Sequence, residues 1–546
     1  MKSKRITRAV ARLDTSNQRS LFDDGTDAVP MAAPPAEDHS ASALRFEDPD
    51  PGLIRLNEVR LDTHLKRTGQ HGALKVRELL ASLDWSGFEQ RYKACGRPPY
   101  APRAMLGLIL HGIMQGISSL RALENLARTD LGCMWVSGGI LPDHSVIGRF
   151  IQRHEAELTG VFFDQLTAQV LRATGSGVST VAGDGSLIEA AASRFNLMKA
   201  EALAQAIEQE QAPSPATDGT DVATDDKRQR RLTQLTEAQE VLQQRQAQRR
   251  AKGKPSDGLQ INVQEPEAVL QPQKDKKRFA ASYKPSVLAN DIRVIVGQAV
   301  DPASEGAVVP DLLQQAQRHG SIETALFDAG YFSASVINAA AQHDIELLCP
   351  EGQSRGEDWN KTSEAYYPKS RFVYDPDTDS YRCPQGQTLR RKGRYKGNER
   401  YAGYTLYATS ACASCDHKAA CTKSSQGRQL KRYASDAGKD ALRAKMQQPQ
   451  ARERYVKRQA MVEPVFSHLR YQQGLNRFRR KGLSGVRLEF SLHALAYNLS
   501  RAVAIGYSSS VCRRLFDVCA PVRRIFARIW RMIAESPSCP DYQVAA

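Results

Sequence analysis

Apolar residues recur at helical spacing in the first third of the chain, between about residues 53 and 173. The runs VRELLASL, APRAMLGLILHGIMQ and GVFFDQLTAQVLRA are separated by breaks at GRPPYAP, TDLG and LPDHS. This spacing predicts a compact helical N-terminal domain over residues 51–173. Two helices joined by a short turn can place one helix in a major groove, and SLRALENLARTDLG with PDHSVIGRFIQRHE is a candidate pair. The alternative is a plain scaffold of packed helices.

Beyond residue 173 the pattern changes to short β-type runs bounded by Gly and Asp. The four clearest runs are STVAGDG from Ser179, RVIVGQAV from Arg293, ETALFD ending at Asp328, and DIELLCP from Asp344. Two runs end at an aspartate, Asp184 or Asp328, where a strand turns into a loop. Such a position is common for a catalytic carboxylate, and it is also common for a helix N-cap.

Changes in composition divide the rest of the chain. Residues 1–50 are rich in Pro, Asp, Ser and Ala, which predicts a disordered tail. A polar stretch over about 199–277 predicts a solvated helical hairpin, inserted into the first part of a β-containing core over 174–350. The remaining segments are predicted to be a Cys-bearing insertion over 351–440, the end of the core over 441–505 and a basic C-terminal tail over 506–546.

A third acid lies in the late segment YVKRQAMVEPVFSHLRYQQGL, which starts at Tyr455 and has apolar residues at broadly helical spacing. Proline is tolerated best in the first turn of a helix, so Pro464 predicts a helix that begins near Val462. Glu463 would then lie in that first turn. Its alternative role is an ordinary acidic residue favoured by the helix dipole.

Charge narrows the class of partner. The 546 residues include 76 Lys and Arg against 60 Asp and Glu, a formal net charge of +16, which favours a polyanion such as nucleic acid or an anionic membrane surface. The most apolar run, from Ala104, is broken by His111 and Gln115 and is too short for a membrane span. No secretory signal is visible at the N-terminus, so we expect a cytoplasmic protein.

Ten cysteines in so long a chain do not indicate a disulfide scaffold, and thiols or metal ligands in a reducing compartment fit better. Four of them have the spacing C-x28-C-x2-C-x5-C: Cys383, Cys412, Cys415 and Cys421. Four thiolates could close a tetrahedral structural Zn²⁺ site, with His417 as an alternate ligand. The spacing meets the usual zinc-ribbon pattern only in part, so free thiols are the alternative.

Three motifs in order carry a family resemblance. GDGSLIEAAAS, then FDAGYFS, then YVKRQAMVEPVFSHLR followed by EFSLHALAYNLSR resemble the Asp-Asp-Glu (DDE) transposases of bacterial insertion sequences. The similarity is to the branch with an InsH-type N-terminal domain, which GRPPYAPRAMLGLILHGIMQGISSLRALE also resembles. The resemblance implies an α+β or α/β fold: an RNase H-like mixed-sheet core preceded by a helical DNA-binding domain. It implies Asp184, Asp328 and Glu463 as the catalytic acids.

The implied activity is cleavage and strand transfer at terminal inverted repeats of double-stranded DNA, by a homodimer in the bacterial cytoplasm near the nucleoid. Three carboxylates suffice to hold two Mg²⁺ or Mn²⁺ ions, which activate the attacking oxygen and stabilise the leaving oxygen. The predicted DNA phosphate contacts are Tyr455, Arg458, Arg470, Arg477, Arg479, Arg480 and Lys481. Two of these depart from the family pattern: Arg458 lies one residue further from the glutamate, and Arg470 stands in place of a lysine.

Two other functions share these features. A non-catalytic, domesticated DNA-binding protein would have the same charge and helical domain, although intact acids at all three positions argue against it. A nuclease that cuts without joining would share the whole site, and no residue in the sequence separates it from a transposase.

Overall fold

The protein is described by a computed structural model that covers residues 45–93, 97–212, 222–251, 253–273, 278–352, 366–367, 369–398 and 402–506. Most of the predicted N-terminal tail and all but the first residue of the predicted C-terminal tail lie outside these ranges. Residues 45–50 are described and packed: the backbone N–H of Glu47 donates to the Pro99 carbonyl at 2.8 Å.

The stretch predicted to be helical forms a set of short helices, which follow a 3-10 turn (Pro51–Leu53) and a small hairpin of β1 (Arg55–Leu56) and β2 (Val59–Arg60). The helices are α1 (Leu61–Arg67), α2 (His71–Ala81), α3 (Ser86–Glu89), α4 (Pro102–Met114), α5 (Leu120–Thr129), α6 (Leu131–Ser137), α7 (His144–Arg153), α8 (Glu155–Thr159) and α9 (Val161–Thr174). The most apolar of them, α4, is buried on nearly every face, which explains its continuous apolar run. Within the described ranges, no helix has the length and hydrophobicity needed to cross a bilayer.

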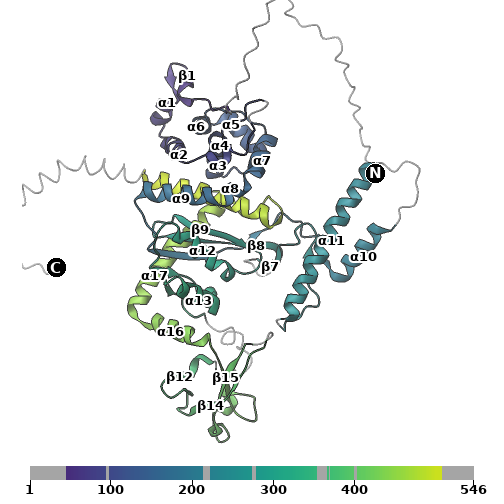
Figure 1. Ribbon diagram of the computed structural model, residues 1–546, viewed down its shortest axis with the longest axis vertical. Helices are drawn as coiled ribbons and strands as arrows, with labels where there is room; N and C mark the ends of the chain where they lie inside the picture. Colours follow the sequence, from purple (N-terminus) through teal and green to yellow (C-terminus); the bar gives the residue numbers. More distant parts are fainter. Residues whose placement is uncertain are drawn as a thin grey trace, which may run out of the picture. The chain divides into compact units, whose positions relative to one another are not determined.

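The second part of the chain contains a seven-stranded mixed sheet (Figure 1). Its strands are β3 (Thr180–Gly185), β4 (Ile188–Glu189), β7 (Val269–Pro272), β8 (Phe279–Asn290), β9 (Ile295–Asp301), β10 (Thr324–Leu326) and β11 (Glu346–Leu348). Five of them lie side by side in the order β9–β8–β3–β10–β11. The pairs β9–β8 and β8–β3 are antiparallel, and the pairs β3–β10 and β10–β11 are parallel. Strands β4 and β7 also pair with β8. All four strands predicted from apolar runs are confirmed.

Around the sheet lie the helices α12 (Val309–Gln317), α13 (Ala334–Gln342), α16 (Asp436–Gln447) and α17 (Pro449–Tyr471). Helix α17 packs on β3 and β8, and α12 packs on β9. The buried side of α17 carries Arg458 among apolar residues such as Val462 and Leu469. The helix that supplies the predicted third acid is therefore packed directly on the strand that supplies the first.

The prediction that this helix begins near Val462 is wrong. Helix α17 begins at Pro449, thirteen residues earlier, and has Pro464 inside it. A proline has no N–H to bond to the carbonyl four residues before it. Here that carbonyl, of Ala460, accepts a hydrogen bond from Arg293 Nε at 3.0 Å. The lost helical bond is replaced from the sheet side, so Glu463 lies in the interior of the helix and not in its first turn.

Both predicted insertions have structure of their own. The first is a helical hairpin of α10 (Ala200–Gln211) and α11 (Val222–Ala251), followed by β6 (Gln260–Asn262), which pairs with β5 (Leu197–Lys199). Its few leucines form a small separate core. The second is an antiparallel sheet of β12 (Val373–Asp375), β13 (Ser380–Arg382), β14 (Thr388–Tyr395), β15 (Tyr404–Ala408) and β16 (Gln429–Tyr433), with short helical turns at Lys369–Arg371, Ser410–Cys412 and Lys418–Cys421.

The helical domain and the sheet share one continuous hydrophobic core. A last helix over residues 482–506 joins them and runs beside α9 (Figure 1). Its Asn498 Nδ2 donates to Thr167 Oγ1 on α9 at 3.2 Å and to the Ile295 carbonyl of β9 at 2.8 Å. The boundary predicted near residue 173 stays a prediction, but deleting the helical domain would expose part of this core.

Candidate active site

The two predicted aspartates are brought together by strand register. Strands β3 and β10 are parallel neighbours in which Leu326 pairs with Ala182. Asp184 and Asp328 each lie two residues beyond this pair, so both lie at the carboxyl ends of adjacent strands. Adjacent strands are about 4.8 Å apart, which places the two carboxylates at the same edge of the sheet. Asp328 also caps a turn by accepting from Gly330 N at 2.9 Å, so its capping role is present, and its catalytic role stays a prediction.

Glycines on both sides of Asp184 are required by close neighbours. A Cβ on Gly183 would lie 2.1 Å from a ring carbon of the buried Phe327, and a Cβ on Gly185 would lie 2.5 Å from Glu305 Cγ. Real Cβ atoms do not approach other atoms so closely. The Gly-Asp-Gly triplet therefore lets the ring of Phe327 and the carboxylate arm of Glu305 pack against the strand next to Asp184.

Arg458 of α17 joins the two aspartates. Its Nη2 lies 3.1 Å from Asp184 Oδ1 and 3.8 Å from Asp328 Oδ2, and it also donates to the Gly183 carbonyl at 3.3 Å. Because both distances start at one nitrogen, the two carboxylate oxygens are no more than about 7 Å apart. The guanidinium is buried, and its Nε has no hydrogen-bond partner among the described residues.

Burial controls the protonation of Asp184. The pKa of Asp184 is raised to about 6, with burial as the main cause; the negative charge of Asp328 contributes to this rise, while Arg458 acts in the opposite direction. Burial also raises the pKa of the neighbouring Cys349 thiol to about 12, and this thiol donates to the Asp328 carbonyl at 3.0 Å. With Arg458 beside it, Asp184 is therefore mostly ionised at neutral pH and takes up a proton as the pH falls below about 6.

Glu463 is not placed with the two aspartates. Its side chain is exposed and accepts a hydrogen bond from Gln459 Nε2 at 3.1 Å. Glu463 is five positions after Arg458, which corresponds to a rotation of about 140° around the helix axis, so the two side chains leave α17 in different directions. Among the described residues, no three His, Cys, Asp or Glu side chains are positioned to hold one metal ion. The assignment of Glu463 stays a prediction.

Glu305 is an acid near Asp184 that the sequence did not indicate. It follows β9, pairs with Lys284 Nζ at 3.4 Å, and acts with Asp328 to raise the pKa of Asp184. A single glutamate in the polar loop DPASEGA has no distinguishing pattern. The only available signal was Gly185, since a glycine next to a candidate catalytic acid can indicate the close approach of another group.

Comparison with known proteins identifies the class. Residues 63–153 match a family model described as a transposase domain (DUF772), and residues 382–503 match one described as a transposase DDE domain. The chain is a DDE transposase. Among curated proteins no significant match was found. A solved piggyBac transposase synaptic complex with hairpin DNA is 11% identical, with 86% of this chain and 82% of that chain covered, but its TM-score of 0.31 does not establish a common fold.

The two matched regions of the transposase contain some of the predicted domains and site residues but not all of them. The helical domain lies largely within the first region, and Glu463 with the basic segment after it lies within the second. Asp184 and Asp328 lie outside both. Their assignment depends on the register of β3 and β10 and on the shared contact with Arg458.

Two of the predicted phosphate contacts in the transposase are engaged with its own backbone. Arg470 Nη2 donates to Ser186 Oγ and to the Leu187 carbonyl, each at 2.7 Å. Arg477 donates to the carbonyls of Ala190 at 3.0 Å and Ala192 at 2.5 Å. Both arginines hold the loop that follows Asp184, which is a structural role. Tyr455 is half-buried on α17 beside Arg458, and burial raises its pKa.

The four cysteines of the predicted zinc site converge at one end of the second sheet. Cys383, Cys412, Cys415 and Cys421 all line a small cavity of about 30 Å³, which His417 also lines. The other three thiols raise the pKa of Cys421 in addition to the effect of burial. The Gln387 backbone N–H donates to Cys383 Sγ at 3.3 Å.

Proposed function

We propose that this transposase binds the terminal inverted repeats of an insertion sequence and carries out metal-dependent cleavage and strand transfer with Asp184, Asp328 and Glu463. The observation that carries the proposal is the placement of Asp184 and Asp328 at adjacent strand ends, bridged by Arg458. An RNase H-like core is supported by the strand order: numbered in chain order, β9–β8–β3–β10–β11 reads 3-2-1-4-5, with Asp184 ending the first strand and Asp328 following the fourth.

The donor set at the sheet edge fits Mg²⁺ or Mn²⁺. Both ions prefer carboxylate oxygens and keep several waters, so two aspartates and a phosphate oxygen provide suitable ligands. Asp184 and Asp328 would hold the ions, which stabilise charge on the attacking and leaving oxygens of the phosphodiester. In the arrangement described here, Arg458 supplies the positive charge between these carboxylates. We propose that it turns to the DNA phosphate when a cation is bound.

Glu463 is proposed as the third acid because it lies on the same helix as Arg458 and within the region matched to the DDE domain. Reaching the aspartates requires a change in its side-chain direction or in the helix around Pro464. Glu463→Gln should lower cleavage by orders of magnitude and leave DNA binding intact. Glu453→Gln is the matched control, an exposed glutamate on the same helix. Equal cleavage by the two variants would remove Glu463 from the site.

Recognition of the element's ends is assigned to the helical domain. A hollow of about 670 Å³ beside α7 is lined by Arg97, Arg128, Arg149 and Arg153 together with Tyr92, Tyr100 and Phe150. Arg153 stacks over the Tyr92 ring at 4.8 Å. Clustered arginines and aromatic rings suit contacts with DNA phosphates and bases. Arg149→Glu with Arg153→Glu should abolish preference for the repeats, whereas Arg67→Glu, exposed at the end of α1, should not.

We propose a structural Zn²⁺ in the second sheet because the four cysteines line one cavity. In the described structure no three of them are positioned to hold one ion, so their side chains would turn toward one another when zinc binds. This sheet has only a small core of its own, made of Phe372, Tyr381, Leu389, Tyr407 and Leu430. Metal binding would add the folding free energy that such a core lacks. We also infer that a homodimer brings two element ends together, in the bacterial cytoplasm where the chromosome lies.

One experiment tests the proposed activity and its alternatives. Purified protein is incubated with Mg²⁺ and linear DNA that carries the element's terminal inverted repeats. Cleaved ends together with joined products support the transposase. Cleaved ends without joined products would favour the nuclease, and repeat-specific binding without cleavage would favour the domesticated DNA-binding protein.

A further inference from the structure

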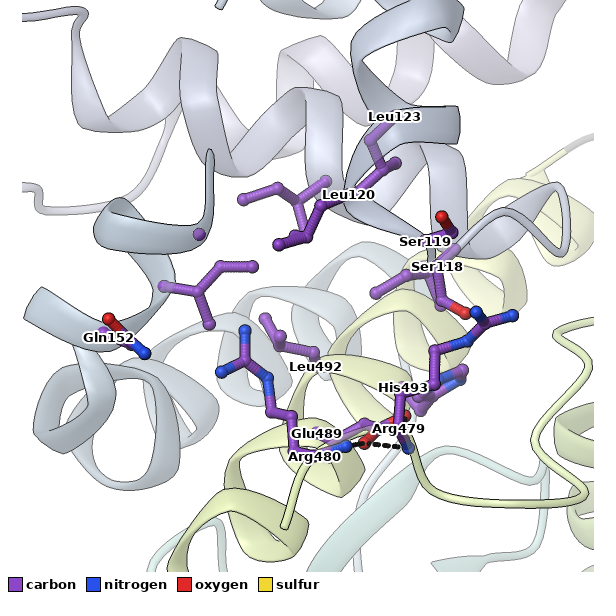
Figure 2. Close-up of a pocket in the computed structure, with 14 residues that line it drawn as sticks. Ser118, Ser119, Leu120, Leu123, Gln152, Arg479, Arg480, Glu489, Leu492 and His493 are labelled. Atoms are coloured by element: carbon purple, nitrogen blue, oxygen red, sulfur yellow. Dashed lines mark hydrogen bonds between the residues drawn. The ribbon is translucent and has the colours of Figure 1, made fainter. Parts of the chain in front are cut away.

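A second site lies between the helical domain and the last helix of the core. It is a pocket of about 310 Å³, a size suited to a small ligand such as a nucleotide unit. One wall is apolar and comes from α4, α5 and α7, and it includes Leu120 and Leu123. The opposite wall comes from residues 479–493. Figure 2 shows Arg479 and Arg480 on the opposite side of the pocket from these leucines.

The backbone at this wall is held by carboxylates. Glu489 is buried and accepts from the backbone N–H of Arg479 at 2.9 Å and of Arg480 at 2.8 Å. Glu265 and Glu267 accept in the same way from Gly482 and Leu483. The carboxylates thus bind the main chain of the segment, and Glu489 and Glu155 act on the Arg480 guanidinium through their charge without a side-chain hydrogen bond to it.

Both guanidiniums are consequently available to a ligand. Neither Arg479 nor Arg480 forms a side-chain hydrogen bond or ion pair with any described residue. Arg480 is partly buried, and burial lowers its pKa. A partly buried guanidinium whose N–H groups have no hydrogen-bond acceptor is unfavourable, and an anion in the pocket would provide the acceptors. The side chains of Ser118, Ser119 and Gln152 line the same pocket and also lack hydrogen bonds to described residues.

We propose that this pocket binds a phosphate group of nucleic acid, with the guanidiniums on the phosphate and the attached sugar against the apolar wall. Arginine is suited to this because its planar donors match phosphate oxygens in pairs. We take this phosphate group to be a backbone phosphate of the transposon DNA. A free nucleotide carries the same phosphate group and is the alternative ligand. The ligand class rests on the proposed transposase function. Because the pocket touches both parts of the chain, its occupation would link end binding to the catalytic core.

The test measures binding and not cleavage, so its failure can be told apart from failure of the proposed activity. Deoxyadenosine monophosphate and deoxyadenosine are titrated calorimetrically into the full chain. In a second arm, the affinity for a repeat-bearing duplex is measured against salt. Arg480→Gln should weaken monophosphate binding at least tenfold and reduce the salt slope by about 0.9, the value for one lost phosphate contact. Arg121→Gln, an exposed arginine on α5 outside the pocket, should change neither result.

Ser118→Trp, which fills the pocket and keeps both arginines, provides a second variant and should also weaken monophosphate binding. Binding of deoxyadenosine as tight as that of its monophosphate would overturn the phosphate assignment. If Arg480→Gln lost monophosphate binding but kept the parent's salt dependence of duplex affinity, the pocket would bind a free nucleotide. That result would overturn the assignment to a phosphate of the transposon DNA. If both variants bound the monophosphate and the duplex like the parent, the pocket would have no such ligand.

Discussion

Replacing Arg458 by methionine should destabilise the protein in a way that depends on both pH and divalent cation. The substitution keeps length and burial but removes the charge between Asp184 and Asp328 and the hydrogen bond to the Gly183 carbonyl. Breaking a fully buried ion pair costs about 3–5 kcal/mol, whereas an exposed pair contributes about 0–1 kcal/mol. Because the side chains of Asp184 and Asp328 are 22% and 44% exposed, we expect a loss of about 2–3 kcal/mol at pH 7.5.

The pH dependence follows from the raised pKa of Asp184. Its pKa is about 6 in the fold against an ordinary value of 3.8, so ionisation of Asp184 opposes folding as pH rises from about 4 through 6. Without Arg458 this pKa rises further. The difference between variant and parent should therefore be largest above pH 7 and smallest below pH 4, where the carboxyl is protonated in both states.

Denaturant unfolding of both proteins, with and without Mg²⁺, measures these effects. A cation held by Asp184 and Asp328 should stabilise the variant more than the parent, since Arg458 no longer competes with it. At a free concentration of ten times its Kd, such a cation adds about 1.4 kcal/mol to the free energy of unfolding. Arg477→Met is the matched control, because Arg477 donates only to backbone carbonyls. The reasoning would be refuted if Arg458→Met cost less than about 0.5 kcal/mol, or if Mg²⁺ stabilised the variant and the control equally.

Three further predictions concern the fold. Gly183→Ala should cost about 1–3 kcal/mol by overpacking against Phe327, while Gly177→Ala, which has open space, should not; equal unfolding midpoints would contradict the packing argument. Burial lowers the pKa of His154 to about 4 from 6.5, so stability present above pH 6.5 should fall as pH drops toward 4. His154→Phe should flatten this fall, and an unchanged pH profile would exclude His154 as its source. Cys412→Ser with Cys415→Ser should remove about one zinc per chain, measured by elemental analysis, and lower stability; a metal-free parent would refute the zinc site.

The local pattern of apolar and polar residues was sufficient to predict many of the strands and helices. The strands ending near Asp184 and Asp328 were predicted correctly because each is an apolar run stopped by a polar residue or glycine. The helices of the N-terminal domain were predicted because their apolar residues keep helical spacing. In both cases the signal lies within a few residues of the element itself.

Other features depended on contacts that are distant in sequence. The start of α17 was predicted wrongly because Arg293, far away in the chain, compensates for Pro464. The proximity of Glu305 to Asp184 depends on how the loop after β9 packs on Gly185. Local pattern also did not indicate that Arg470 and Arg477 would hold the loop after β3 with their guanidiniums.

Cleavage of transposon-end DNA by Asp328→Asn, compared with Asp344→Asn, tests the central claim most directly. Asp328 follows β10 beside Arg458, whereas Asp344 precedes β11 with a φ of 54°, a conformation that asparagine also adopts readily. Both variants remove one carboxylate charge from the same part of the chain and should bind the DNA like the parent. We predict that Asp328→Asn abolishes Mg²⁺-dependent cleavage and that Asp344→Asn cuts at the parent rate. Near-parental cleavage by Asp328→Asn would contradict the assignment of the active site to this edge of the sheet.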